Sequence, residues 1–256
     1  MSEPTTRSDA TLDPAEIERF GRLAAEWWDN NGNFRTLHLI GPARLTFLRD
    51  AITRHFGTAD SDGARGLRPL EGLTILDVGC GGGLVCEPLA RLGGRVTGID
   101  PAAENIEAAR RHAHGQGLDI EYRAARIEDL ASEGRTFDAV VCFEVVEHVP
   151  DVGAFLKTLA SLARPGGLLL LSTINRTMKA YFLAIIAGEY VLRWLPVGTH
   201  QWDRFVTPDE LSRYLQNAGV AAPTFMGLAY SPMSDAWSLS AGDTDVNYFA
   251  ASAKPG

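Results

Sequence analysis

The feature that most constrains the fold is a stretch from Ile75 to Gly83, in which a short apolar run precedes four glycines in five positions. Branched apolar side chains from Ile75 to Val78 are typical of a buried parallel strand, which has no polar face. The glycines allow a sharp turn and let a ligand approach main-chain N–H groups, because no Cβ is in the way. The pattern from Leu84 to Leu92 predicts a helix. A glycine turn between a strand and a helix is where open α/β sheets bind nucleotide-like ligands.

A second apolar strand, Arg95 to Ile99, ends in the carboxylate of Asp100. An acidic residue about 20 positions after such glycines commonly binds ribose hydroxyls. A dinucleotide is not favoured, because Leu84 stands where the usual Gly-x-Gly-x-x-Gly pattern has its third glycine. The chain also lacks the Gly-Lys-Ser/Thr of a P-loop. A ligand with adenine and ribose but without pyrophosphate fits best, which points to S-adenosylmethionine.

The bulk properties exclude several classes of function. The 256 residues are enough for one α/β domain with a sizeable core. A formal net charge of −8 argues against nucleic acid as a main partner, since such binding depends on Lys and Arg contacts with phosphates. Cys80, Cys86 and Cys142 have no metal-like spacing and predict reduced, buried thiols. Residues 1–12 do not resemble a signal peptide, and the longest uncharged apolar run, residues 180–188, is too short to span a bilayer.

The first quarter of the chain predicts helices and loops that contribute to the ligand site. Residues 1–12 are polar and predict a disordered N-terminus. Residues 13–70 predict N-terminal helices at about 13–28 and 42–56, followed by a flexible loop from Gly57 to Pro69. The adjacent Trp27 and Trp28 are interpreted as a packing anchor, with a role in a substrate lid as the alternative.

From residue 73 onward, strand and helix patterns alternate, which implies right-handed crossovers and a parallel sheet. Strands are expected at about 73–78, 94–99, 119–124, 137–143 and 167–173, with helices at about 84–92, 102–115 and 151–163. A long apolar helix at about 177–195 and a helix capped by Thr207 to Glu210 follow. Two late strands, at about 220–228 and 245–252, predict an antiparallel pair at one edge of the sheet.

Three segments of the chain resemble signatures of class I S-adenosylmethionine-dependent methyltransferases. They are Ile75 to Gly83, Gly98 to Asp100 and Pro165 to Gly167. The resemblance implies a Rossmann-like α/β fold: a mostly parallel seven-stranded sheet with an antiparallel edge strand, helices on both faces and additional N-terminal helices. The methyltransferase domain would span residues 71–256, with an apolar helical insertion at about 177–196.

Flanking segments narrow the resemblance to the ubiquinone-biosynthesis O-methyltransferases. The segments that carry it are Trp27 to Asp29, Leu37-His38, Pro42 to Arg44, Phe143 to Val149, Ser172 to Arg176, Gly198 to His200 and Val246 to Tyr248. That family implies methylation of a phenolic or catechol hydroxyl of polyprenylated precursors, at the 2-polyprenyl-6-hydroxyphenol and 3-demethylubiquinol steps. Two departures are Gly41, where the family pattern has Asn before the Pro, and the inserted loop at residues 57–69.

The resemblance also implies how the methyl donor is held. It assigns Arg44 to the methionyl carboxylate, and the backbone of Gly79 and Gly81 to the amino-acid end and the ribose. Asp100 would bind the ribose hydroxyls, although a strand-end carboxylate also serves as an N-cap for the next helix. Phe143, at the end of the fourth strand, resembles a position that contacts the cofactor.

The segment after the third strand is the expected adenine site of this superfamily. Ile127 would lie against the adenine ring, and Glu128 would accept a hydrogen bond from its amino group. The alternative is that this segment is plain surface without a ligand.

Three residues after the fourth strand are candidates for activating the substrate. An ordinary phenol has a pKa near ~10, so a general base or a Lewis acid must remove or acidify its proton. In a helix, Glu144, Glu147 and His148 would share one face. Together they would hold a divalent cation such as magnesium, or His148 alone would act as the base. A partly structural role also stays open, because a Glu-His pair after this strand recurs in class I enzymes of many specificities.

The predicted apolar helix bears on where the protein works. Its three charges, at Lys179, Glu189 and Arg193, fall within an arc of about 80° of a helical wheel. It is either a core helix packed on the sheet, or a lid or interfacial helix that dips into a bilayer surface. Because a polyprenyl substrate resides in membranes, we expect a cytoplasmic protein bound peripherally to the inner face of the cytoplasmic membrane. Other ubiquinone-biosynthesis proteins are candidate partners.

Two other functions remain alternatives. One is a class I methyltransferase acting on another small phenol or an amine; the absence of an Asn/Asp-Pro-Pro-Tyr/Phe sequence disfavours methylation of nucleic-acid amino groups. The other is a non-catalytic scaffold in a membrane-associated biosynthetic complex.

Overall fold

The computed structural model describes residues 17–18, 21–58, 66–182, 202–231, 233 and 236–256. Several predicted features lie outside these ranges: the disordered N-terminus at 1–12, the start of the first helix, the centre of the 57–69 loop and most of the apolar helix at 177–196. Within the described part of the N-terminal helix, a short 3-10 helix, η1 (Ala24–Glu26), precedes the tryptophan pair.

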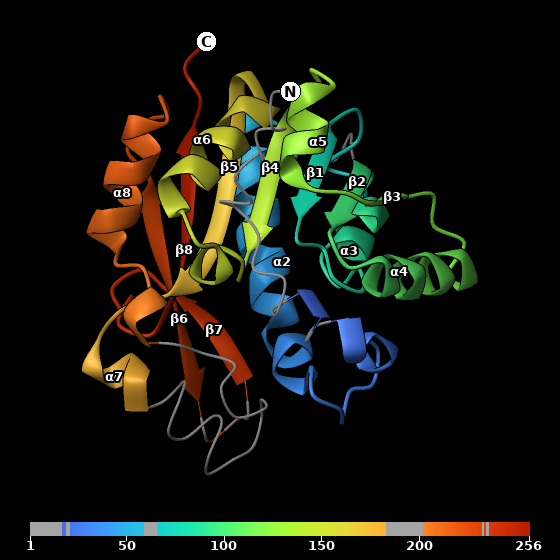
Figure 1. The fold of residues 1–256 in the computed structure, drawn as a ribbon, viewed down its shortest axis with the longest axis horizontal. Helices are drawn as coiled ribbons and strands as arrows, with labels where there is room; N and C mark the ends of the chain where they lie inside the picture. Colours follow the sequence, from blue (N-terminus) through green and yellow to red (C-terminus); the bar gives the residue numbers. More distant parts are fainter. Residues whose placement is uncertain (1–16, 19–20, 59–65, 183–201, 232, 234–235) are drawn as a thin grey trace, which may run out of the picture.

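One eight-stranded sheet forms the centre of the protein, in the order β3-β2-β1-β4-β5-β8-β6-β7 (Figure 1). Strands β1 to β5 pair in parallel, and β8 runs antiparallel between β5 and β6. The strands are β1 (Thr74–Val78), β2 (Arg95–Asp100), β3 (Glu121–Ala124), β4 (Phe137–Phe143), β5 (Ala163–Ile174), β6 (Thr224–Ser231), β7 (Ala236–Ser240) and β8 (Asn247–Ala253). The predicted fold class and the late antiparallel pair, β6 with β8, are confirmed.

The sheet has one strand more than the seven predicted. The additional strand, β7, pairs antiparallel with β6 at the edge of the sheet and packs against a long helix, α2 (Arg35–Phe56). Its apolar positions, Trp237 and Leu239, alternate over only five residues and are partly buried. Such a short alternation gives a weak strand signal, because most of the strand's stability comes from its packing partner.

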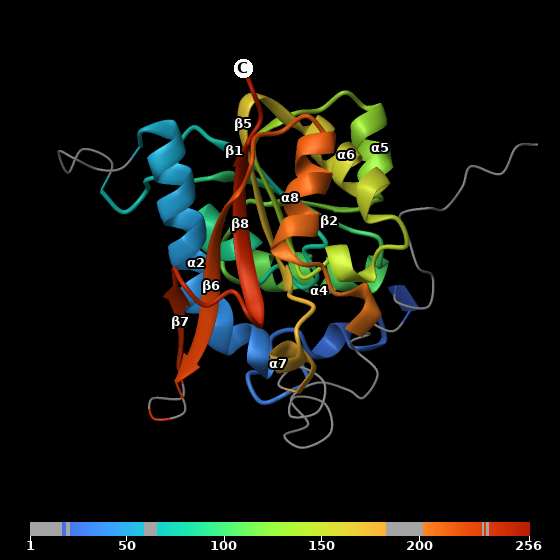
Figure 2. The ribbon, with the colours of Figure 1, turned by 90° about the vertical axis from the view of Figure 1, so that its left-hand side faces the viewer.

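Helices cover both faces of the sheet (Figure 2). The apolar cluster on one face combines strand residues with helices α5 (Ile127–Ser132), α6 (Val152–Leu162) and α8 (Pro208–Asn217). The cluster on the opposite face combines them with α2, α3 (Cys86–Arg91) and α4 (Ala103–Gly115). Alternate residues of β1 point to opposite faces of the sheet: Leu76 and Val78 belong to the cluster with α5, α6 and α8, and Ile75 belongs to the cluster with α2, α3 and α4.

Helix α2 begins at Arg35 rather than near residue 42, so that boundary prediction was wrong. It placed Pro42 at the first helical position, which proline often occupies. Pro42 instead lies inside the helix, where it has no N–H to donate to the carbonyl one turn earlier. The helix continues through it and ends at Gly57, whose φ of 63° forms a left-handed cap. Because α2 begins at Arg35, Arg44 lies near the middle of the helix, close to the carboxyl ends of the strands.

The remaining elements are short: η2 (Val146–His148), α7 (Met178–Ala180) and η4 (Trp202–Arg204). Within the described ranges, no helix has both the length and the apolar character needed to cross a membrane.

Candidate active site

The glycine loop after β1 adopts conformations that only glycine accepts easily. Gly79 and Gly81 have φ angles of 73° and 52°. The N–H groups of Gly79 and Cys80 both donate to the carbonyl oxygen of Ile99, at 2.9 and 3.0 Å, which ties the loop to the end of β2. A Cβ on Gly81 would lie 2.4 Å from the Trp27 ring, and one on Gly79 would lie 2.5 Å from a methyl group of Val145. Both backbone conformation and space therefore require glycine here.

Asp100 ends β2 beside this loop, as the sequence predicts. One carboxylate oxygen, Oδ2, accepts the N–H of Gly81 at 3.1 Å. The other, Oδ1, accepts the N–H of Ala102 at 2.9 Å and the amide of Asn105 at 3.1 Å. Asp100 is buried, and this burial raises the pKa of its carboxyl group, while the three donors oppose the shift. The bond to Gly81 joins the carboxylate to the glycine loop, which an N-cap alone would not do.

Arg44 reaches the same region from α2. Arg44 is 5% exposed; its Nη2 lies 3.4 Å from Oε1 of Glu144, and its guanidinium carbon lies 5.9 Å from the centre of the Phe143 ring. Its Nε is buried without a hydrogen-bond partner. Arg44, Phe143 and Glu144 thus meet at the carboxyl end of β4, with one donor of Arg44 left unsatisfied.

Asp77 is a buried acid in this region to which sequence analysis gave no role. Oδ2 of Asp77 accepts the Sγ–H of Cys86 at 3.1 Å. Burial raises the pKa of Asp77 to about 7, partly offset by the Cys86 hydrogen bond and by the charge of Arg44. The predicted reduced, buried state of the cysteines agrees with the structure, in which Cys80, Cys86 and Cys142 are all free and buried.

Glu144 and Glu147 lie close together, but not on one helix face. Glu144 has a φ of 54°, and only the three residues of η2 that follow Val145 are helical. The segment is therefore not the helix in which Glu144, Glu147 and His148 would share one face. Strand β5 holds both carboxylates: Ser172 Oγ donates to Glu144 at 2.7 Å and Thr173 Oγ1 to Glu147 at 2.9 Å.

The two carboxylates differ in their surroundings. Glu147 is 3% exposed, and its Oε1 has no hydrogen-bond partner. Burial, and then the charge of Glu144, raise the pKa of Glu147 well above its usual range. Glu144 faces the Arg44 cation. Because ionised carboxylates only accept hydrogen bonds, Glu144 and Glu147 can hydrogen-bond to each other only if one of them is protonated. His148 is half-buried at the end of η2.

The described part of the chain contains no group of three or more His, Cys, Asp and Glu side chains arranged to hold a metal ion. Glu144, Glu147 and His148 are all within that part, so as arranged they do not form a ready-made metal site.

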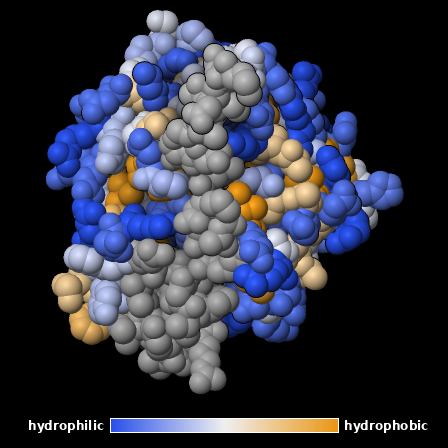
Figure 3. Space-filling model, in the orientation of Figure 1, coloured by the Kyte–Doolittle hydropathy of each residue, from blue (hydrophilic) through white to orange (hydrophobic). Residues whose placement is uncertain are grey.

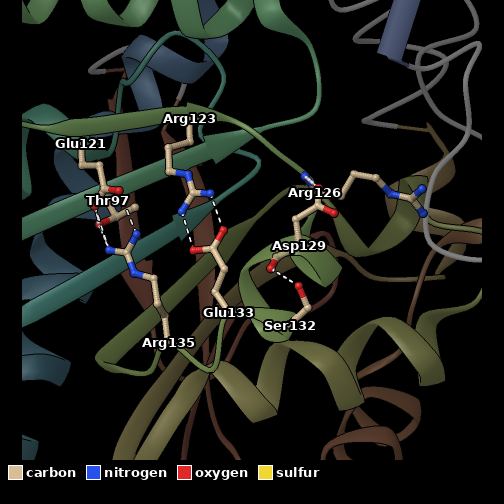
Figure 4. Close-up of polar contacts among 8 residues, drawn as sticks. All are labelled: Thr97, Glu121, Arg123, Arg126, Asp129, Ser132, Glu133 and Arg135. Atoms are coloured by element: carbon tan, nitrogen blue, oxygen red, sulfur yellow. Dashed lines mark hydrogen bonds and ion pairs between the residues drawn. The ribbon is translucent and has the colours of Figure 1, made fainter.

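The predicted adenine segment forms the start of α5, which the sequence had not indicated as a helix. Figure 4 shows the backbone N–H of Arg126 facing the Asp129 carboxylate, a bond of 2.9 Å that caps the helix, while the Arg126 side chain extends away from it. Arg126 Nε lies 3.5 Å from Glu128 Oε2. Ile127 is 4% exposed and belongs to the core cluster. The contacts of Ile127 and Glu128 with adenine stay a prediction.

Comparison with known proteins identifies close relatives. A family model described as a methyltransferase domain matches residues 43–222. A ubiquinone biosynthesis O-methyltransferase from Rhodopseudomonas palustris (strain BisB18) is 51% identical over 97% of this chain and 95% of its own length. One from Methylobacterium sp. (strain 4-46) is 49% identical over 100% of this chain and 99% of its own length.

Solved structures support the fold. A possible histamine N-methyltransferase from Thermotoga maritima matches with a TM-score of 0.63 and 16% identity, over 93% of this chain and 99% of that one. Magnesium protoporphyrin IX methyltransferase from Synechocystis PCC 6803, with bound S-adenosylhomocysteine, matches with a TM-score of 0.61 and 20% identity, over 93% and 94%.

Proposed function

Because the chain belongs to the ubiquinone biosynthesis O-methyltransferases, S-adenosylmethionine-dependent enzymes, we propose that it methylates phenolic hydroxyls of polyprenylated ubiquinone precursors. The two steps proposed are those of 2-polyprenyl-6-hydroxyphenol and of 3-demethylubiquinol. The observation that carries the proposal is the meeting of the glycine loop, Asp100 and Arg44 at the carboxyl ends of β1, β2 and β4. This end of an open α/β sheet is the usual ligand site.

The methyl donor is held by residues of the glycine loop after β1, of the strands β2 and β4, and of the helices α2 and α5. The ribose hydroxyls donate to Asp100, and the backbone of Gly79 and Gly81 lies along the ribose and the amino-acid end. Arg44 binds the methionyl carboxylate, for which its unsatisfied Nε provides a donor. Phe143 contacts the donor from β4. At the start of α5, Ile127 packs against the adenine ring, and Glu128 accepts a hydrogen bond from the adenine amino group.

Methyl transfer is a displacement at the sulfonium methyl carbon. The phenolate oxygen forms the new O–CH₃ bond as the S–CH₃ bond breaks, and S-adenosylhomocysteine leaves. The phenol proton passes to His148, which acts as the general base. Glu144, two residues before η2, is held in place by Ser172 and Arg44. Holding donor and acceptor in line supplies much of the acceleration.

A divalent cation such as magnesium, held by Glu144, Glu147 and His148, is the second candidate for acidifying the phenol. The observation in its favour is the buried Oε1 of Glu147, which has no hydrogen-bond partner and lies near a second carboxylate. Such an ion would act as a Lewis acid toward a catechol. The present arrangement of these side chains does not form a three-ligand group, so we derive no step through a metal.

The experiment that tests the function is methyl transfer from labelled S-adenosylmethionine to short-chain analogues of both precursors. We expect labelled methyl ethers of both. Activity with unrelated phenols or amines and not with these analogues would favour another substrate class, and no product with any divalent metal would favour a scaffold.

A chelator separates the two ways of activating the phenol. Activity that survives exhaustive treatment with EDTA would assign proton removal to His148 alone. Activity that is lost in EDTA and restored by Mg²⁺ would assign it to a cation at the acidic pair.

We further propose that the protein is cytoplasmic and reaches its substrate through peripheral membrane contact by the 177–196 segment. Large exposed apolar side chains lie at the start of that segment and just after it: Met178, Phe182 and Trp202 are 61%, 56% and 38% exposed. Apolar surface is visible at the position of α7 in Figure 3. Replacing all three by Ser should weaken flotation with anionic liposomes while leaving turnover of a water-soluble substrate unchanged. Equal flotation of the wild type and the triple variant would argue against this contact. Other ubiquinone-biosynthesis proteins remain candidate partners.

A further inference from the structure

The tryptophan pair near the N-terminus is attached to the glycine loop at several points. The Trp27 ring packs so closely on the loop that a Cβ added to Gly81 or Gly82 would lie 2.4 Å from it. The Nε1–H of Trp28 donates to the carbonyl oxygen of Gly82 at 3.0 Å. The Trp28 ring also stacks on His112, with ring centres 3.4 Å apart. The pair is therefore more than a hydrophobic anchor, because it contacts the loop that receives the methyl donor.

Trp27 is connected to Asp100 through a single side chain, Asn105. The indole Nε1–H of Trp27 donates to Asn105 Oδ1 at 2.8 Å. Asn105 Nδ2 then donates to Asp100 Oδ1 at 3.1 Å. Because the other oxygen of Asp100 accepts the N–H of Gly81, and Trp27 packs on Gly81, the four residues form a closed ring of contacts. Asn105 is 1% exposed and Trp27 8%, so water does not substitute easily for either bond.

The chemistry of Asn105 fits a positioning role. Its amide offers an acceptor on one side and a donor on the other, and Trp27, which can only donate, occupies the acceptor. The amide is therefore oriented with its Nδ2 toward Asp100. Asp100 is an acceptor of ribose hydroxyls only while its carboxylate keeps a fixed orientation. Of the three donors that fix it, Asn105 is the one supplied by a side chain.

We propose that Asn105 and Trp27 are positioning residues for the methyl donor: Asn105 orients the Asp100 carboxylate toward the ribose hydroxyls, and Trp27 orients Asn105. This inference rests on the proposed role of Asp100. It gives Trp27, which lies 73 positions before Asp100 in the sequence, a role in cofactor affinity.

The test measures the Kd of S-adenosylhomocysteine by titration calorimetry for the wild type, Asn105→Ala, Trp27→Phe and the double variant. Asn105→Ala removes a hydrogen bond to a charged group, and we expect a Kd at least about tenfold higher. Trp27→Phe keeps the aromatic stack on Phe34, whose ring centre lies 3.8 Å away, but loses the N–H donor. Its expected loss is a few-fold, and the double variant should bind no more weakly than Asn105→Ala.

A second ligand separates positioning from general damage to the fold. An analogue of S-adenosylhomocysteine lacking both ribose hydroxyls cannot use Asp100, so the variants should bind it as the wild type does. Trp237→Phe is the matched control, because Trp237 lies on β7 and its Nε1 has no hydrogen-bond partner.

Three outcomes would overturn the inference: an unchanged Kd for Asn105→Ala, equal losses for both ligands, or additive losses in the double variant. A wild-type protein that fails to bind S-adenosylhomocysteine would instead contradict the proposed function. Should Asn105→Ala not fold, the ratio of the two ligand affinities in Trp27→Phe decides alone.

Discussion

The Arg44 guanidinium lies 3.4 Å from the Glu144 carboxylate, so one ion pair joins the middle of α2 to the end of β4. The pair is largely shielded from water, with the two side chains 7% and 24% exposed. Its position means that a single cation faces both the proposed donor site and the proposed acceptor site.

Replacing Arg44 by Ala should raise the Kd of S-adenosylhomocysteine about 10- to 100-fold, because a charge-assisted hydrogen bond to the methionyl carboxylate is lost. Arg44→Lys should recover only part of the affinity, since an ammonium lacks the planar fork. Binding of methylthioadenosine, which has no carboxylate, should not change. Arg49→Ala, an exposed position on the same helix, is the control. Tight binding of S-adenosylhomocysteine by Arg44→Ala would remove Arg44 from the site.

Gly81→Ala should destabilise the protein by more than about 1 kcal/mol, because alanine is strained at positive φ and its Cβ would collide with the Trp27 ring. Affinity for S-adenosylhomocysteine should fall as well. Gly115→Ala, where a Cβ would meet nothing within 4 Å, should be neutral or slightly stabilising. Chemical denaturation of the two variants makes the comparison, and equal stabilities would refute the steric argument.

Asp77 should make the free energy of unfolding fall as pH rises. Its pKa in the folded protein is about 7, against ~3.9 for an unfolded aspartate, so the folded state binds the proton more tightly. Between these values the unfolded state carries fewer protons, and stability is lost with increasing pH. Relative to Asp77→Asn, the wild type should lose on the order of 4 kcal/mol between pH 4 and 8, at about 1.4 kcal/mol per pKa unit.

Denaturant titrations of wild type and Asp77→Asn at several pH values measure this difference. Asp119→Asn, which removes an exposed carboxylate, controls for the change in net charge. A pH-independent difference between wild type and Asp77→Asn would mean that Asp77 stays ionised in the folded state.

His148→Asn should lower kcat about 10²- to 10⁴-fold while leaving the Kd of S-adenosylhomocysteine unchanged, because a general base contributes to the chemical step and not to donor binding. The residual rate should increase with pH as the substrate phenol ionises by itself. His114→Asn, at an exposed position near the end of α4, is the matched control. A kcat close to that of the wild type would exclude His148 as the base.

The parts of the site that could be predicted from sequence are those fixed by local chemistry. The glycines after β1 and the carboxylate of Asp100 each follow directly from an apolar strand, and their roles depend on where a strand ends. Arg44 was predicted through family resemblance, although the start of its helix was misplaced because Pro42 was taken as the first residue instead of an internal one.

The contacts that sequence did not reveal join residues distant along the chain. Trp27 and Asn105 are 78 positions apart, and Ser172 and Glu144 are 28 apart, so no periodicity or spacing relates them. The left-handed φ of Glu144 is likewise set by its surroundings. It could not be predicted, because glutamate has no intrinsic preference for this conformation. Strand β7 was missed because its five residues gain their stability from α2.

The place of β8 between β5 and β6 has a consequence for how the protein is made. The strand that completes the sheet follows the other seven along the chain, and the β6–β7 hairpin has no neighbour on the sheet until β8 arrives. During synthesis the parallel half of the sheet can form while β6 and the edge of β5 are still unpaired. Unpaired strand edges favour association between chains. Deletions that end the chain before Asn247 remove β8 and should thus also detach β6 and β7 from the sheet, whereas a tag placed after Gly256 leaves these pairings intact.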